Sequence, residues 1–202
     1  MSFYQQLQSA TSTSQQLMMS APVIHACRQG TITGEMYVAF LTQIYHHVSY
    51  TVPLLMAASG RVPQHQEWAR QALTAYINAE YGYKASLRRK IRACGVEMDT
   101  WRQRAVAEWI ELMAAYFYDQ IQRGNPMSIF GLMHVLEGLN LNITTSTTGQ
   151  SPSRAPTNQT PLPCFATLMD NINDSADQAA IIHAAHVVYR LYGDMLRSLT
   201  EH

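Results

Sequence analysis

The feature that most constrains the fold is the recurrence of apolar residues every three or four positions along long segments. One such face, in the segment that follows Thr33, consists of Tyr37, Leu41, Ile44, Val48, Val52 and Leu55. Thr33 is a typical residue for capping the start of a helix, and Gly60 marks the end of the segment. No segment shows the alternation of apolar and polar residues that is typical of strands. The chain is therefore predicted to be all-α.

The same pattern predicts one domain, residues 1–202, built as a bundle of about seven helices, several of them long. The longer predicted helices cover residues 2–19, 33–60, 65–94, 100–123, 127–140 and 174–199, and short helices follow Pro22 and Pro163. Residues 143–161 have no apolar period and are rich in Thr, Ser, Gly, Gln, Asn and Pro. They are predicted to form an exposed, flexible loop.

Composition limits the classes of partner. Lys and Arg number 14 and so do Asp and Glu, so the chain lacks the basic excess that a nucleic-acid phosphate backbone requires. No run is apolar and long enough to cross a bilayer, and no signal peptide is apparent, so no membrane partner and a cytoplasmic location are expected. No glycine-rich phosphate loop or dinucleotide fingerprint occurs, so no nucleotide cofactor is expected.

Acidic residues that fall on apolar helical faces are the first candidates for function. They are Glu80, Glu137, Asp170, Asp174 and Asp177. The three aspartates are spaced i, i+4 and i+7, so a helix would place them on one face, continuous with the apolar stripe of the last helix. Inward carboxylates cost free energy unless they are paired, protonated or bound to a metal. Each acid alone is best interpreted as a hydrogen-bond partner in the core, whereas five together suggest a metal site.

Histidine and tyrosine side chains supply further candidates. His46 and His47 are adjacent on a predicted helix and point about 100° apart, so at least one should face the interior. Each is either a core residue bonded to a neighbour or an acid/base group that lines a pocket. His134, one turn before Glu137, and Tyr83 are also candidate acid/base groups.

Two more histidines, His183 and His186, lie off the apolar stripe of the last helix and in line with Arg190. The His-x-x-His spacing suggests a metal site, but this face is expected to be solvated. A metal there is therefore not expected.

Residues 29–55 resemble the first long helix of the heme-oxygenase-like superfamily. The most specific signal is a Gly-x-x-Thr turn followed by Tyr-x-x-Phe-Leu-x-Gln-x-Tyr-His, which begins at Gly30 and ends at His46. That superfamily includes heme oxygenases, TenA thiaminases, the quinone-cofactor synthase PqqC and diiron oxidases related to the chlamydial protein CADD. Glu80 and the Asn125-Pro126 to Glu137 segment follow in the order that the superfamily uses.

The resemblance implies a metal site, in which this chain replaces some of the ligands that the diiron oxidases use. In the diiron oxidases the last helix resembles His-x-x-x-Asp-x-x-His, and here the matching positions are Asp170, Asp174 and Asp177. Glu80 and Glu137 match, while Tyr83 and Leu87 stand at the two positions, three and seven residues after Glu80, where a histidine is expected. The implied cofactor is iron or manganese. Heme is not expected, because residues 2–19 contain no proximal histidine.

The function expected on this basis is that of a metal-dependent oxidase or oxygenase-like protein, leaning to an oxidoreductase, that acts on a small organic molecule in a central cavity. One alternative is a cofactor-free enzyme like PqqC or TenA, in which His46 or His47, His134 and tyrosines such as Tyr83 handle protons. Another alternative is a non-catalytic ligand-binding protein with a degenerate metal site. The expected partner is a small molecule, and homodimerisation is left open.

Overall fold

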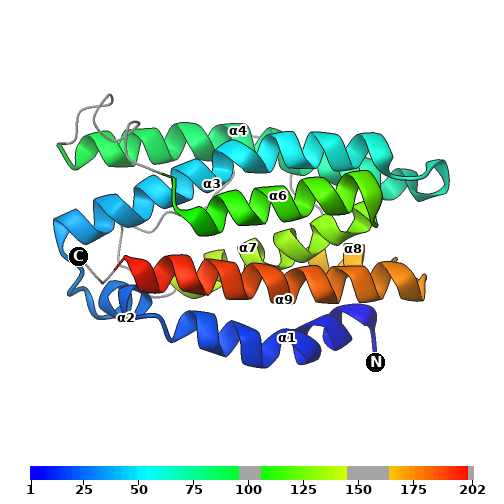
Figure 1. The fold of residues 1–202 in the computed structure, drawn as a ribbon, viewed down its shortest axis with the longest axis horizontal. Helices are drawn as coiled ribbons and strands as arrows, with labels where there is room; N and C mark the ends of the chain where they lie inside the picture. Colours follow the sequence, from blue (N-terminus) through cyan, green and yellow to red (C-terminus); the bar gives the residue numbers. More distant parts are fainter. Residues whose placement is uncertain (96–105, 145–163, 200–202) are drawn as a thin grey trace.

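The computed structural model describes residues 1–95, 106–144 and 164–199 (Figure 1). The α-helices in these ranges are α1 (Phe3–Met19), α2 (Pro22–Gln29), α3 (Gly34–Arg61), α4 (Glu67–Ala93), α6 (Glu108–Arg123), α7 (Ile129–Thr144), α8 (Phe165–Asp170) and α9 (Ser175–Ser198). Two short 3-10 helices, η1 (Gln64–Gln66) and η2 (Pro126–Ser128), precede α4 and α7. These ranges contain no strand, so the all-α prediction is confirmed.

Capping residues set some helix boundaries where the sequence predicts them. The Thr33 hydroxyl accepts a hydrogen bond from the Met36 backbone N–H at 3.2 Å and begins α3. Gly30 ends α2 with φ at 68°, a left-handed conformation that favours glycine.

Two predicted boundaries differ from the structure. The helix predicted over residues 100–123 begins at Glu108, because Val106 and Ala107 are not helical, while residues 100–105 lie outside the described ranges. α7 continues to Thr144, so the first two residues of the predicted loop 143–161 are helical. Residues 145–161 of that loop lie outside the described ranges.

α9 is the helix that the other helices surround most closely. It packs against α1, α6 and α7, and Figure 1 shows it running between α1 and α6 on the near face of the bundle. Its predicted core stripe is confirmed, because Ile181, Ala184, Val188, Leu191 and Met195 are all buried. No described helix has the length and apolar character that a membrane span requires.

A glycine allows the close contact between α7 and α9. A β-carbon added at Gly131 would lie 2.6 Å from the Ile181 carbonyl oxygen and 2.7 Å from the Ala185 backbone nitrogen. Both are backbone atoms, so any larger side chain would push the two helices apart. Gly131 therefore fixes the distance between α9 and the helix that carries His134 and Glu137.

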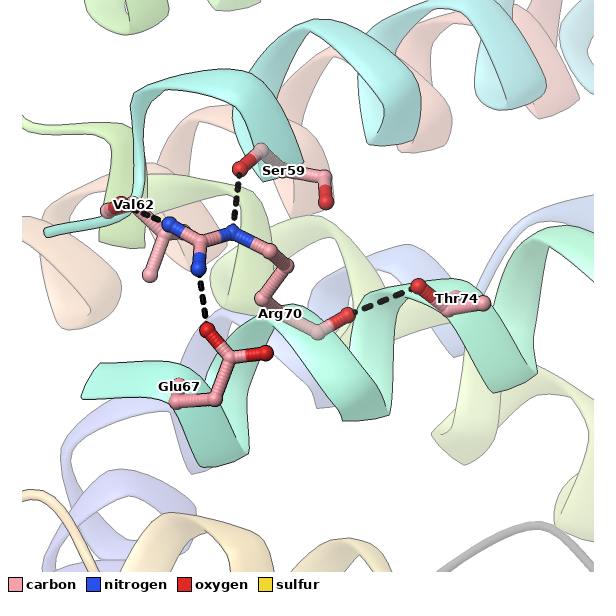
Figure 2. Close-up of polar contacts among 5 residues, drawn as sticks. All are labelled: Ser59, Val62, Glu67, Arg70 and Thr74. Carbon is pink, nitrogen blue, oxygen red and sulfur yellow. Dashed lines mark hydrogen bonds and ion pairs between the residues drawn. The ribbon is translucent and has the colours of Figure 1, made fainter. Parts of the chain in front are cut away.

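The corner between α3 and α4 is held by Arg70 (Figure 2). Its guanidinium donates to the backbone carbonyls of Val62 at 2.7 Å and Ser59 at 3.3 Å, and it forms an ion pair with Glu67. The carbonyls at the end of a helix have no partner within the helix, so Arg70 satisfies groups that α3 leaves open. This contact orients α4, which carries Glu80, against α3.

Candidate functional site

Two of the three aspartates do not face the core. Asp170 and Asp174 are exposed, so the prediction that they point inward is wrong. The reason is that α8 ends at Asp170 and α9 begins only at Ser175, so the helical i, i+4 spacing does not apply between them.

Both exposed aspartates instead bind backbone N–H groups at helix starts. The Asp170 carboxylate accepts from the Tyr4 N–H at 2.9 Å, in the first turn of α1. Asp174 is the N-cap of α9 and accepts from the Ala176 and Asp177 N–H groups, each at 2.9 Å. N–H groups in the first turn of a helix have no partner within the helix, so these two carboxylates stabilise α1 and α9.

Asp177 does face inward and is 8% exposed. One carboxylate oxygen accepts from the Gln66 side-chain amide at 2.6 Å, and the other accepts from the Asn125 side-chain amide at 2.7 Å. Gln66 lies in η1, and Asn125 caps η2. Asp177 therefore joins α9 to two connections that are distant in the sequence.

The two glutamates come from α4 and α7. Glu80 is 1% exposed, and Glu137 is half-buried and accepts a hydrogen bond from the Tyr76 hydroxyl at 3.4 Å. Burial raises the pKa of Glu137, and the bond from Tyr76 partly opposes that rise. Tyr76 and Glu80 are four residues apart on α4 and share one face of it.

No three of the five acids come together in one group in the described structure. The described residues, which include all five, hold no group of three or more His, Cys, Asp or Glu side chains placed to bind a metal ion. A two-iron centre in a helical bundle needs several carboxylates and imidazoles that converge on one point. Since N–H donors occupy the three aspartates, the observed donor set does not fit an iron pair.

His134 lies in a buried contact with α1 and is 7% exposed. Its Nε2 is 3.1 Å from the Thr11 hydroxyl oxygen, and the Thr11 hydroxyl donates to the Leu7 carbonyl at 2.8 Å. Because the single hydroxyl proton is used in that bond, Nε2–H of His134 donates to Thr11. Burial lowers the pKa of His134 from 6.5 to about 4, so its imidazole is neutral at pH 7.

The other acid/base candidates lie elsewhere. His47 is 2% exposed, with Nε2 3.2 Å from the Thr51 hydroxyl oxygen and its ring edge-on to Tyr192 at 5.3 Å. His46 is half-buried beside Tyr45, and burial raises the pKa of Tyr83. His47 is thus the more deeply buried of the adjacent pair.

His47 and His134 contact different tyrosines of α9. The His134 ring is edge-on to Tyr189 at 6.0 Å, whereas His47 contacts Tyr192. Each of these two histidines has its Nε2 within hydrogen-bond distance of a threonine hydroxyl. His47 and His134 therefore lie in two different contacts with α9.

A cavity of about 720 Å³ lies where α1, α6 and α9 meet, and we call it the α9 cavity. It is lined by Ser14, Leu17, Leu112, Tyr116, His183, His186, Val187, Tyr189, Arg190, Leu191 and Arg197. The sequence correctly predicts that His183, His186 and Arg190 lie in one line. It does not predict the cavity that they border. The exposed apolar residues Leu17 and Leu112, 62% and 45% exposed, lie on two other helices.

The polar groups of the α9 cavity differ in how they are bonded. His186 Nδ1 is 2.8 Å from the Ser14 hydroxyl oxygen, and Arg197 forms an ion pair with Asp194 at 2.6 Å. The Tyr116 hydroxyl is buried and has no hydrogen-bond partner among the described residues. Arg190 is exposed and also lacks a hydrogen bond or ion pair within the described parts of the chain.

Solved structures of similar fold cover nearly the whole chain. A TenA homologue from Pseudomonas syringae pv. tomato has a TM-score of 0.75 at 10% identity, over 98% of this chain and 92% of that chain. Heme oxygenase-1 from the cyanobacterium Synechocystis, in complex with heme, has a TM-score of 0.66 at 12% identity, over 99% and 93%.

A third structure, a domain of unknown function with a heme oxygenase-like fold from Shewanella denitrificans, has a TM-score of 0.67 at 14% identity, over 95% and 89%. At these identities the structures establish the fold and nothing further.

Sequence comparison gives the family. A search of curated proteins yields no match. The sequence model of a family described as iron-containing redox enzymes matches residues 38–150, which span α3, α4, α6 and α7. The heme-oxygenase-like resemblance seen in the sequence is confirmed, and the chain belongs to this family of iron-containing redox enzymes.

Proposed function

We propose that this protein binds a small organic molecule in the α9 cavity, and that four of the five acids of the expected metal site, Glu137, Asp170, Asp174 and Asp177, serve the fold. The observation that carries the proposal is the cavity itself. Its volume of about 720 Å³ lies within the range of roughly 300–1,000 Å³ that is typical of small-molecule pockets.

The lining of the cavity supports this function. Such pockets combine apolar walls with a few polar groups that fix the orientation of the ligand. Here Leu17, Leu112 and Val187 supply apolar surface, and Tyr116 and His186 supply polar atoms. The polar and apolar groups come from three helices, so the cavity depends on the assembled bundle.

The family description implies iron. The contacts of the described acids argue against an iron site made of these side chains. An oxidase reaction at Glu80, Glu137, Asp174 and Asp177 would need their side chains to converge. Asp174 and Asp177 hold backbone and amide N–H groups, and Glu137 accepts from Tyr76. These contacts favour a ligand-binding role over an iron-dependent oxidase role for this member of the family.

Fluorescence titration with the neutral probe phenylnaphthylamine tests the proposal, because this probe brightens when it enters an apolar pocket. We expect saturable binding to the wild-type protein and loss of that binding in Val187→Trp, which fills the cavity. Tyr118→Ala is the matched control, because Tyr118 is an exposed aromatic residue of α6 that does not line the cavity. Absence of saturable binding to the wild-type protein would refute the proposal, as would unchanged binding to folded Val187→Trp.

A further inference from the structure

The charged side chains that line the α9 cavity, among the described residues, are two arginines and no acid. Arg197 is paired with Asp194, so Arg190 supplies the positive charge that no described acid offsets. Across the whole chain basic and acidic residues are equal, at 14 each. A concave surface of one charge sign attracts ligands of the opposite sign.

We propose that the ligand of the α9 cavity is an organic anion, an apolar body that bears a carboxylate or similar group held by Arg190. This inference rests on the proposed function and adds the chemical class of the ligand.

Arg190 is available for such a ligand, in contrast to other arginines. Arg70, Arg123 and Arg197 each form an ion pair with an acid on their own helix. Arg190 forms no hydrogen bond or ion pair with any described residue. A guanidinium group can donate two parallel hydrogen bonds to a carboxylate, so Arg190 offers a specific site for one.

Two further side chains, Tyr116 and His186, can complete the recognition of the anionic group. The Tyr116 hydroxyl is buried without a partner in the described ranges, and burial raises its pKa, so it remains a donor. A buried hydroxyl without a partner is unfavourable, and a ligand oxygen would satisfy it. His186 is bonded through Nδ1 to Ser14, which leaves Nε2 as the ring nitrogen for a ligand.

The rest of the cavity suits the apolar part of the ligand. Leu17 and Leu112 are large apolar side chains that are more than two-fifths exposed, and Val187 and Leu191 extend the apolar surface along α9. Covering exposed apolar surface is favourable, in proportion to the area removed from water. An inorganic anion would leave this surface uncovered, so the charge and the apolar wall together indicate an amphipathic molecule.

Two probes that share one ring system test the charge requirement. Anilinonaphthalene sulfonate is anionic, and phenylnaphthylamine is its neutral counterpart. We expect the sulfonate to bind the wild-type protein at least about tenfold more tightly than the neutral probe, with a preference that falls as salt increases. Arg190→Gln should weaken sulfonate binding about tenfold and leave the neutral probe unchanged.

The controls separate this inference from the function on which it rests. Arg28→Gln removes an exposed arginine of α2 outside the cavity and should leave both affinities unchanged. Naphthoate should displace the sulfonate at about tenfold lower concentration than naphthalenemethanol does. Neutral-probe binding with no preference for the sulfonate, or a preference unaffected by Arg190→Gln, would overturn the inference while the proposed function stands. Binding of neither probe would overturn both.

Discussion

Two polar clusters of the C-terminal segment contrast with each other. In the aspartate run, residues 170–177, every carboxylate accepts hydrogen bonds from N–H groups of the protein. Along the outer face of α9, by contrast, Arg190 lacks a partner among the described residues, and it lines a cavity together with His183. Whether a polar side chain is available to a ligand therefore depends on whether it already bonds to another group of the protein, and not on its residue type or spacing.

Removing Asp177 should have the largest effect on stability. Asp177→Ala leaves the side-chain amides of Gln66 and Asn125 without their acceptor inside the protein. We expect the free energy of unfolding, measured in urea, to fall by about 3 kcal/mol.

Asp177→Asn is the matched control, because it keeps one acceptor and should lose less. A loss below about 1 kcal/mol in Asp177→Ala would show that this contact is weak and would break the contrast between the two clusters.

His134 offers a comparison between two histidines that bond to hydroxyls of α1. Its partner is Thr11 in the core, whereas His186 bonds to Ser14 at the cavity. The pKa of His134 is about 4 in the folded protein against 6.5 for the free side chain, so between these values the unfolded state binds more protons. The contribution of His134 to the free energy of unfolding should therefore be fully present above pH 6.5. It should decline as pH falls toward 4, by at most about 3 kcal/mol.

Urea unfolding across this pH range, with the wild-type protein and His134→Gln, measures the effect. The glutamine amide can still donate to Thr11 but does not titrate, so the variant should lose most of this pH dependence. If the free energy of unfolding changed equally with pH in the two proteins, His134 would not be the source of this pH dependence.

Loss of the α9 cap should have a smaller effect. Asp174→Ala removes the acceptor for the Ala176 and Asp177 N–H groups and should lower the free energy of unfolding by about 1 kcal/mol. Asp174→Ser restores a cap and should recover most of the loss. If Asp174→Ala and Asp174→Ser were equally destabilised in thermal unfolding, the capping role would be wrong.

The cavity residues should have the smallest effect on stability. Arg190→Gln is expected to change the free energy of unfolding by less than about 0.5 kcal/mol, because Arg190 bonds to no described residue. The same urea assay measures it beside Asp177→Ala. A fall in the free energy of unfolding above about 1 kcal/mol would show that Arg190 stabilises the fold. It would remove the contrast between the aspartate run and the residues of the α9 cavity.

Much of the fold could be predicted because its signals are local. The caps at Thr33 and Gly30 and the buried stripe of α9 follow from residues that are close in the sequence. The break between α8 and α9 agrees with the predicted start of the last helix at residue 174, where Asp174 is a typical N-cap. The error lay in applying helical i, i+4 spacing to Asp170, which comes before that break.

The site was less predictable because its contacts are long-range. Asp177 bonds to amides that are 111 and 52 residues away, and no local pattern identifies Gln66 or Asn125 as its partners. The α9 cavity likewise needs side chains from α1 and α6, among them Leu17 and Leu112. The sequence places His183, His186 and Arg190 on one face but cannot show which other helices border that face.

The central claim is that the three aspartates and Glu137 of the expected metal site hold the fold together. The most direct test is the iron content of protein that is produced with ample iron and purified without chelator. The contacts of Asp174 and Asp177 predict far less than one iron ion per chain. About two iron ions per chain, lost on substitution of Glu80 by Ala, would be the signature of a two-iron centre and would contradict the account.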